Sequence, residues 1–331
     1  MTAPTLDVLA IGNAIVDVIA QADDPFLGQE GLVKGSMRLI DTAEAERLYD
    51  RMAAGIEASG GSAANTAAGL AALGARAGFI GQVAQDQLGA VFTHDIRASG
   101  VHFATAPRTA EPPTARCLIL VTPDGQRTMN TYLGASQFLD DGAIDPALIE
   151  SAAVLYLEGY LWDPEVPRAA MRRAIDIARA AGRRVAFTLS DGFCVARHRG
   201  DFLQLIADGL IDILFANADE IMSLRETEDF ETAVAATATQ VPLLVVTRSE
   251  QGALAIAAGV RSEVPAEPVA AVVDTTGAGD LFAAGFLAGL ASGEPVADCL
   301  TMGAVAAAEI ISHYGARPEA DLKALVKARL G

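Results

Sequence analysis

The sequence predicts an α/β protein, with a doubly wound, mostly parallel sheet, helices on both of its faces, and a small antiparallel β lid. Short apolar runs alternate with longer helical patterns, and parallel strands of this kind need helices over both faces. Glycine is abundant while aromatic residues make up 5%, which suits helices packed closely over a sheet. We expect one domain spanning residues 1–331, with lid inserts at approximately 14–40 and 103–135.

The regular alternation defines the main sheet and its helices. Apolar runs of strand length predict its strands at Leu6–Ile11, Ala77–Gly81, Val154–Leu157, Val185–Thr188, Ile211–Ala216 and Leu243–Thr247. Longer periodic segments predict helices at Ala63–Leu73, Gln87–Ser99, Glu165–Ala181, Phe230–Ala238, Ala278–Ala291, Val296–Ser312 and Glu319–Leu330.

Two stretches break this alternation and predict the lid. Ala14–Ala20 and Ser36–Ile40 resemble strands with no helix between them. Thr114–Thr122 and Arg127–Leu133 flank a Pro-Asp-Gly turn at 123–125, which predicts a β-hairpin. We expect both pairs to form a small antiparallel sheet that covers a pocket.

Composition excludes several classes of protein. With 42 Asp and Glu against 24 Lys and Arg, the net charge is −18, which argues against binding to nucleic acid. The start of the chain lacks a signal-peptide pattern, and the longest apolar run, Leu281 to Ala291, is too short to cross a membrane. Three cysteines far apart indicate neither disulfides nor a zinc site: Cys117, Cys194 and Cys299. We therefore expect a reduced, soluble, cytoplasmic protein.

The segment from Asp274 to Asp280, DTTGAGD, precedes an apolar helix. Its glycines let the backbone approach a ligand, and the helix N-terminus beyond them attracts anions such as phosphate. The amides of Gly277, Ala278 and Gly279 would then stabilise a transferred phosphoryl group, while Asp280 accepts a proton from the attacking hydroxyl. A purely structural alternative stays open, in which Asp280 only complements the helix dipole.

A second glycine segment, Gly60-Gly61-Ser62-Ala63-Ala64-Asn65, precedes another predicted helix. The paired glycines permit close approach, Ser62 would cap the helix, and Asn65 can offer a donor and an acceptor to a sugar hydroxyl. An ordinary flexible turn is the alternative. A P-loop is excluded because Gly61 stands where the lysine should be. A dinucleotide fingerprint is disfavoured because Phe282 replaces its third glycine.

Together the two glycine segments resemble the signatures of the PfkB, or ribokinase-like, family of carbohydrate and nucleoside kinases. The resemblance runs from Asn13 to Gly315, with the motifs in the family's order. It is strongest toward the bacterial adenosine-kinase-like branch, through Gly12–Asp17, Gly125–Asn130 and Asn217–Glu220. The resemblance implies a ribokinase-like fold, a small-molecule acceptor, and use of ATP with Mg²⁺.

The resemblance also assigns the acceptor site. Asp17 matches the family's aspartate for substrate hydroxyls, and a carboxylate can accept from two vicinal hydroxyls at once. Placement on an exposed strand is the structural alternative for this aspartate. The other substrate-binding candidates are Asn13, Gly60, Gly61 and Asn65.

For the nucleotide, the resemblance points to the turns after two predicted strands. Asn217 and Glu220 match a motif associated with Mg²⁺, and magnesium can be held through water by an amide and one carboxylate. A helix N-cap with Glu at its third position is the alternative. The remaining nucleotide-binding candidates are Thr247, Ser249, Gly252, Gly277 and Gly279.

Three further assignments rest on the resemblance. Arg127, on the second hairpin arm, matches a lid arginine that approaches the phosphates; a solvated arginine is the alternative. Asp274 and Thr276 fall where some relatives bind a monovalent cation such as K⁺. Gly303-Ala304 stands where relatives often carry an asparagine near the nucleotide base, which leaves the base contacts open.

The function that these residues imply is transfer of the ATP γ-phosphate to the 5′-hydroxyl of adenosine or a related nucleoside, as in purine salvage. A PfkB-type sugar kinase acting on a ribose- or fructose-like substrate is the alternative, and a non-catalytic nucleoside-binding sensor is another. The expected partners are small molecules only, with neither nucleic acid nor membrane, and the chain is expected to be a monomer or a homodimer.

Overall fold

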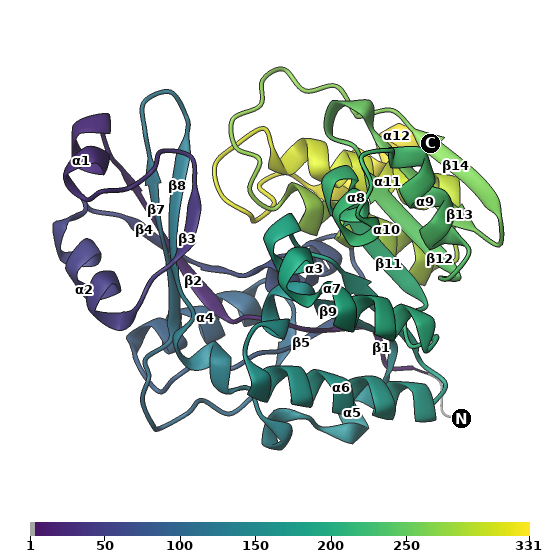
Figure 1. Ribbon diagram of the computed structural model, residues 1–331, viewed down its shortest axis with the longest axis horizontal. Coiled ribbons are helices and arrows are strands. Elements are labelled where there is room, and N and C mark those ends of the chain that lie inside the picture. The colour runs from purple at the N-terminus through teal and green to yellow at the C-terminus, as the bar shows by residue number, and fades with distance from the viewer. Residues whose placement is uncertain (1–3) are drawn as a thin grey trace.

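The computed structural model describes residues 4–331, which form a nine-stranded sheet and a second, five-stranded sheet (Figure 1). The large sheet has the order β14-β13-β12-β11-β10-β9-β1-β5-β6, and all its pairs are parallel except β12–β13 and β13–β14. Its strands in chain order are β1 (Leu6–Ile11), β5 (Ala77–Ile80), β6 (His102–Phe103), β9 (Ala152–Glu158), β10 (Arg184–Thr188), β11 (Ile213–Asn217), β12 (Leu243–Thr247), β13 (Ala253–Ala257) and β14 (Val260–Val264). The predicted mostly parallel α/β sheet is confirmed.

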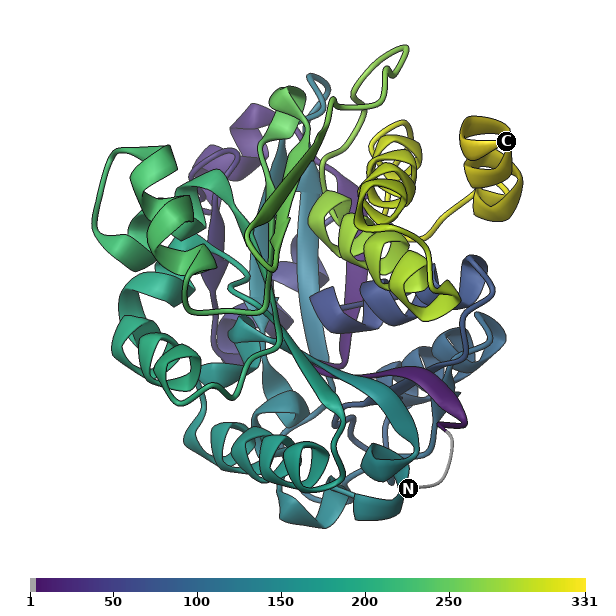
Figure 2. The ribbon, with the colours of Figure 1, turned by 90° about the vertical axis from the view of Figure 1, so that its right-hand side faces the viewer.

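Helices cover both faces of the large sheet, as Figure 2 shows. Alternate residues of each strand point to opposite faces, so Val8 and Ala10 enter one apolar core while Leu9 and Ile11 enter the other. The first core includes residues of α3, α10 and α11, and the second includes residues of α6, α7 and α8.

The helices within the described chain are α1 (Asp24–Gln29), α2 (Thr42–Arg51), α3 (Ser62–Ala72), α4 (Gln87–Ala98), α5 (Pro146–Glu150), α6 (Glu165–Ala180), α7 (Gly192–Ala207), α8 (Ala218–Arg225), α9 (Phe230–Ala238), α10 (Ala278–Ser292), α11 (Val296–Ile310) and α12 (Leu322–Leu330). The sequence analysis did not anticipate α1, α2, α5, α7 and α8. Of the helices between residues 4 and 331, none combines the length and the apolar character needed to cross a membrane.

The second sheet, called the small sheet below, has the order β3-β8-β7-β2-β4. Its strands are β2 (Ile15–Gln21), β3 (Met37–Leu39), β4 (Ile56–Gly60), β7 (Ala115–Val121) and β8 (Arg127–Tyr132). The β7–β8 hairpin is antiparallel as expected, and so is β2–β4, whereas β2–β7 and β3–β8 are parallel.

The small sheet departs from the predicted inserts in three places. Helix α1 lies between the first two strands, because Asp23 caps its N-terminus and Pro25 suits its first turn. Strand β4, outside the predicted 14–40 segment, joins the sheet beside β2. His102–Phe103, at the start of the second insert, pairs with β5 in the large sheet instead.

Candidate active site

Helix α10 begins at the DTTGAGD turn with its amide donors uncovered. Gly277 is the N-cap with φ +79°, and no side chain of the described residues caps the helix. A Cβ at Gly279 would meet no heavy atom of residues 4–331 within 4 Å, so the space beside this turn is open. Because the first amides of a helix lack partners within it, this end can receive an anion.

Asp280 lies in the first turn of α10 and is half-buried. Ser62 Oγ donates to its Oδ1 at 2.6 Å, and Asn65 Nδ2 donates to its Oδ2 at 2.9 Å. Burial raises the pKa of Asp280, while these two hydrogen bonds and the charge of Arg317 oppose the rise. A carboxylate that is fixed in place and made more basic is suited to accept a proton.

The second glycine segment meets the first through α3. Thr66 Oγ1 donates to the backbone oxygen of Asp280 at 3.2 Å, and a Cβ at Gly69 would lie 2.5 Å from a methyl group of Leu281. The prediction that Ser62 caps this helix is wrong: the N-cap is Gly61, and the Ser62 hydroxyl turns instead to Asp280, 218 residues away. Sequence reasoning missed that contact because it exists only in the tertiary fold.

Asn65 is buried and both ends of its amide are engaged. Its nitrogen donates to Asp280, and its Oδ1 accepts from Arg317 Nη1. In this structure Asn65 therefore orients the acid, whereas the sequence analysis expected it to contact a sugar hydroxyl. Arg317 carried no sequence signal, because it lies in an irregular loop beyond the last recognised segment.

Asp17 faces the same site from strand β2 of the small sheet. A Cβ at Gly60 would lie 2.3 Å from Asp17 Oδ2, so the glycine leaves room for this carboxylate. Burial raises the pKa of Asp17 to about 7; the charges of Arg317 and Arg127 lower it, and that of Asp280 raises it further. The structure therefore brings Asp17 and Asp280 within electrostatic reach of each other, although one comes from strand β2 and the other from helix α10.

Asn13 connects this site to a buried acid that the sequence analysis did not identify. Glu158 is fully buried at the end of β9. Its Oε1 accepts from the backbone and side-chain nitrogens of Asn13, each at 2.7 Å, and its Oε2 accepts from Ala63 N at 2.7 Å. Asn13 Oδ1 is buried and finds no partner within residues 4–331, so it remains available to a ligand hydroxyl. Glu158 directly follows the predicted strand Val154–Leu157, which is the signal that could have found it.

Replacing Glu158 by Gln is expected to change how stability depends on pH. Burial raises the pKa of Glu158 to about 7, above its value in the unfolded chain, so the stability that it contributes is lost as pH rises. Between pH 5 and pH 8 the unfolding free energy of the wild type should therefore fall by about 1–3 kcal/mol relative to Glu158→Gln. Urea unfolding of both proteins at both pH values measures this change, in which other titrating groups cancel. A wild type that gains stability relative to Glu158→Gln as pH rises would contradict the assignment.

Arg127, at the start of β8, joins the small sheet to the glycine turn. Its guanidinium forms an ion pair with buried Asp274, donates to Thr276 Oγ1 at 3.3 Å, and lies 5.6 Å from the ring centroid of Tyr314. Asp274 also accepts from the backbone nitrogens of Thr276 and Gly315, each at 3.0 Å. The solvated-arginine alternative is therefore wrong. The monovalent cation at Asp274 and Thr276 stays a prediction, and here the guanidinium holds that carboxylate.

Asn217 and Glu220 form the capping box of α8. Asn217 Oδ1 accepts from Glu220 N at 2.8 Å, its Nδ2 donates to Glu220 Oε1 at 2.6 Å, and its backbone nitrogen donates to Oε2 at 3.0 Å. Burial raises the pKa of Glu220 to about 7. The N-cap reading of this motif is thus what the structure contains. Among the described residues, no group of three or more His, Cys, Asp or Glu could hold a metal. Because Asn217 and Glu220 bond to each other, they would hold Mg²⁺ through the waters that this ion retains.

The remaining nucleotide candidates lie near this cap. Thr247 is the register partner of Asn217, so both stand at the carboxyl ends of neighbouring strands, where ligands of open α/β sheets bind. Ser249 begins the short turn after β12, and Gly252, with φ +83°, ends it.

Gly303 and Ala304 are buried on α11, where a Cβ at Gly303 would lie 2.8 Å from Phe282 O.

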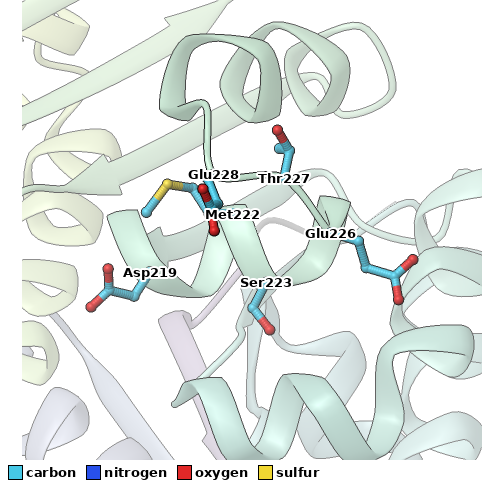
Figure 3. A pocket seen from close by; sticks show the side chains of 6 residues that line it. All are labelled: Asp219, Met222, Ser223, Glu226, Thr227 and Glu228. Atoms are coloured by element: carbon cyan, nitrogen blue, oxygen red, sulfur yellow. The ribbon is translucent and has the colours of Figure 1, made fainter.

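An open depression of about 450 Å³ lies elsewhere, on α8 and the turn after it (Figure 3). Its lining residues are Asp219, Met222, Ser223, Glu226, Thr227 and Glu228. Asp219 lies between Asn217 and Glu220 in the sequence, but none of the six was singled out above for a role in the site.

The chain is similar to known kinases over most of its length. A model of the pfkB family of carbohydrate kinases matches residues 32–322. The crystal structure of adenosine kinase from Sinorhizobium meliloti is 51% identical with a TM-score of 0.93, and the match covers 98% of this chain and 99% of that one. The crystal structure of a probable sugar kinase from Rhizobium etli CFN 42 is 49% identical with a TM-score of 0.94, and the match again covers 98% of this chain and 99% of that one. A fructokinase from Klebsiella pneumoniae is 30% identical over 267 residues, covering 78% of this chain and 86% of that protein.

The ribokinase-like fold that the sequence resemblance implied is therefore confirmed, with a large mostly parallel sheet and a smaller sheet beside it. Kinase activity on a small molecule follows from the family, and so does the use of ATP, usually with Mg²⁺. With a family match from residue 32 to residue 322 and two solved relatives at about half identity, the chain belongs to the pfkB family of carbohydrate kinases.

Proposed function

We propose that this kinase transfers the γ-phosphate of ATP to the 5′-hydroxyl of adenosine or a closely related nucleoside, as in purine salvage. The observation that carries the proposal is the setting of Asp280. Ser62 and Asn65 hold this carboxylate at the open N-terminus of α10, and Asp17 faces it from the small sheet. A base, an anion site and an acceptor for hydroxyls thus converge in one place.

These residues divide the chemistry between them. Asp17 and the free oxygen of Asn13 accept from hydroxyls of the acceptor molecule and so orient it. Asp280 takes the proton from the attacking hydroxyl as its oxygen bonds to the γ-phosphorus and the bond to the ADP oxygen breaks. The amides around Gly277 and Gly279 stabilise the charge on the transferred group. Mg²⁺, when bound, neutralises phosphate charge.

The small sheet supports a nucleoside over a free sugar. On the face that carries Asp17, strands β2, β7 and β8 also present an apolar strip. Half-buried Ile19 and Met129 belong to it, as does Leu133, which directly follows β8. A flat apolar ring attached to the ribose could pack on this strip, whereas a free sugar offers mostly hydroxyls. The Sinorhizobium meliloti relative, an adenosine kinase, supports the same substrate.

A sugar kinase is the second candidate, favoured by the match to the Klebsiella pneumoniae fructokinase. Asp17 can accept from vicinal hydroxyls of a free sugar as well as from those of a ribose ring. Binding without catalysis is less well supported, because Asp280 and both glycine segments are present.

A coupled assay for ADP release, run with adenosine, ribose and fructose in the presence of ATP and Mg²⁺, tests the proposal. We expect the highest kcat/KM with adenosine, loss of turnover when a chelator removes Mg²⁺, and a strongly lowered kcat in Asp280→Asn. Turnover of a sugar but not of adenosine would establish the second candidate instead. A parallel series with and without K⁺ tests the monovalent cation.

A further inference from the structure

Arg317 lies in the loop between α11 and α12, which reaches from the helical layer toward the small sheet (Figure 1). Its Nη1 donates to Asn65 Oδ1 and its Nη2 donates to Ser59 Oγ at 3.0 Å. One side chain therefore joins this loop to strand β4 and to helix α3. Both partners are neutral oxygens.

Three carboxylates lie close enough to act on the charge of this guanidinium. Asp17, Asp280 and Asp95 all act on its charge, while burial lowers the pKa of Arg317 to about 10. Within residues 4–331 none of the three forms an ion pair with it at 4.0 Å or less. The charge of Arg317 thus reaches Asp280 through space, and its hydrogen bonds reach Asp280 through Asn65.

The chemistry of the amide makes this arrangement directional. Arginine can only donate hydrogen bonds, so Arg317 holds the oxygen of the Asn65 amide and leaves its nitrogen toward Asp280. Without that donor, Asn65 Oδ1 would lose its partner in a buried place, and the amide would be held through its nitrogen, by Asp280. Asn65 would then be fixed less firmly, and so would Asp280 Oδ2.

We propose that Arg317 is a positioning residue for the phosphoryl transfer: it fixes the orientation of Asn65, and through Asn65 it aims Asp280 at the acceptor hydroxyl. The inference rests on the proposed function, in which Asp280 accepts the proton. It assigns a role to a loop outside both glycine segments.

The charges facing Asp280 predict the direction of a pH effect. Arg317 faces it from the loop, Asp17 from β2, and Tyr156, Glu158 and Tyr160 from β9 and the turn that follows. Arg317 is the cation in this set, so removing it raises the pKa of Asp280. The acid limb of the kcat profile, that is, the pH range over which kcat falls as Asp280 becomes protonated, then moves to higher pH.

The experiment compares Arg317→Met, which removes charge and donor, with Arg317→Lys, which keeps both. We expect Arg317→Met to lower kcat by about 10–100-fold, to leave the KM for ATP within about twofold, and to shift the acid limb upward. Arg317→Lys should recover the wild-type limb and part of kcat. Arg225→Met is the matched control, since Arg225 also donates to a hydroxyl and an amide oxygen, those of Thr237 and Gln240.

A double-mutant cycle separates positioning from general stability. Because Arg317 acts through Asn65, the pair Arg317→Met and Asn65→Ala should lower kcat little more than Asn65→Ala alone. The proposal would be overturned if the fold losses of kcat in the two single variants multiplied in the double variant. It would also be overturned if folded Arg317→Met kept the wild-type kcat and acid limb. If Arg317→Met does not fold, two other single variants, Ser59→Ala and Arg317→Lys, replace it. An acid limb of the kcat profile that stays at the wild-type pH in both variants supports the role of charge and donor. A shift of that limb in Arg317→Lys refutes it.

The inference can be tested apart from catalysis. In protein labelled at aspartate carboxyl carbons, NMR titration follows Asp280, whose signal is assigned by its absence in Asp280→Asn. The pKa should rise in Arg317→Met and stay in Arg225→Met. An unchanged pKa overturns the inference even if the kinase is active. Lack of turnover by the wild type with every acceptor overturns the proposed function, and the pKa shift then still reports whether Arg317 acts on Asp280.

Discussion

Asp280→Asn should lower kcat by about 10²–10⁴-fold, because the proton of the attacking hydroxyl loses its acceptor. The variant keeps the size of the side chain, and the amides at the start of α10 remain in place, so ATP should bind about as tightly as in the wild type. ADP release measures kcat, and calorimetry measures ATP binding. Near-normal turnover would remove Asp280 from the role of base.

Asp298→Asn is the control for the helix-dipole alternative. Asp298 also lies in the first turn of a helix, α11. Neutralising a first-turn carboxylate costs about 0.3–1 kcal/mol of stability whichever helix it caps. If Asp280 served only the dipole, the two variants would lose similar stability and neither would lose activity.

Gly61→Ala should disrupt the site through the backbone. Gly61 has φ +94°, and a Cβ there would lie 2.2 Å from the backbone oxygen of Asn13. With φ +94° and ψ 136°, the backbone conformation alone costs alanine about 1–3 kcal/mol, and the clash must also push Asn13 away from Glu158. We expect a loss of about 3–5 kcal/mol in unfolding free energy, measured by urea unfolding, and a large fall in kcat/KM.

Gly209→Ala separates the clash from the torsion. Gly209 has φ +66°, but a Cβ there would meet no heavy atom of residues 4–331 within 4 Å. It should lose only the torsional cost and keep full activity. Equal losses in the two variants would show that the contact with Asn13 plays no part.

Local sequence pattern predicted most strands of the large sheet and several of its helices. Leu6–Ile11, Leu243–Thr247 and Phe230–Ala238 have the predicted bounds, because each is an apolar run or helical stripe that its own residues define. The short helices around the small sheet were missed, although Asp23 and Asp41 cap two of them. Six to ten residues carry too little periodicity to outweigh a strand-like neighbourhood.

The candidate site divides in the same way. Gly277 and Asp280 could be predicted because a few consecutive residues, a glycine turn followed by an apolar helix, indicate an anion site. The partners of Asp280 could not, since Ser62 and Asn65 reach it across more than 200 residues. Arg317 depends on an irregular loop, for which sequence periodicity offers no register.

The bond between Arg127 and Asp274 makes two events compete for one guanidinium. If Arg127 turns toward a phosphate of the nucleotide, the buried carboxylate of Asp274 loses its counter-ion and, among residues 4–331, keeps the backbone nitrogens of Thr276 and Gly315. A buried carboxylate in that state recruits another cation or a proton. Nucleotide arrival and uptake of a small cation at this turn would then be thermodynamically linked, each strengthening the other by the same factor.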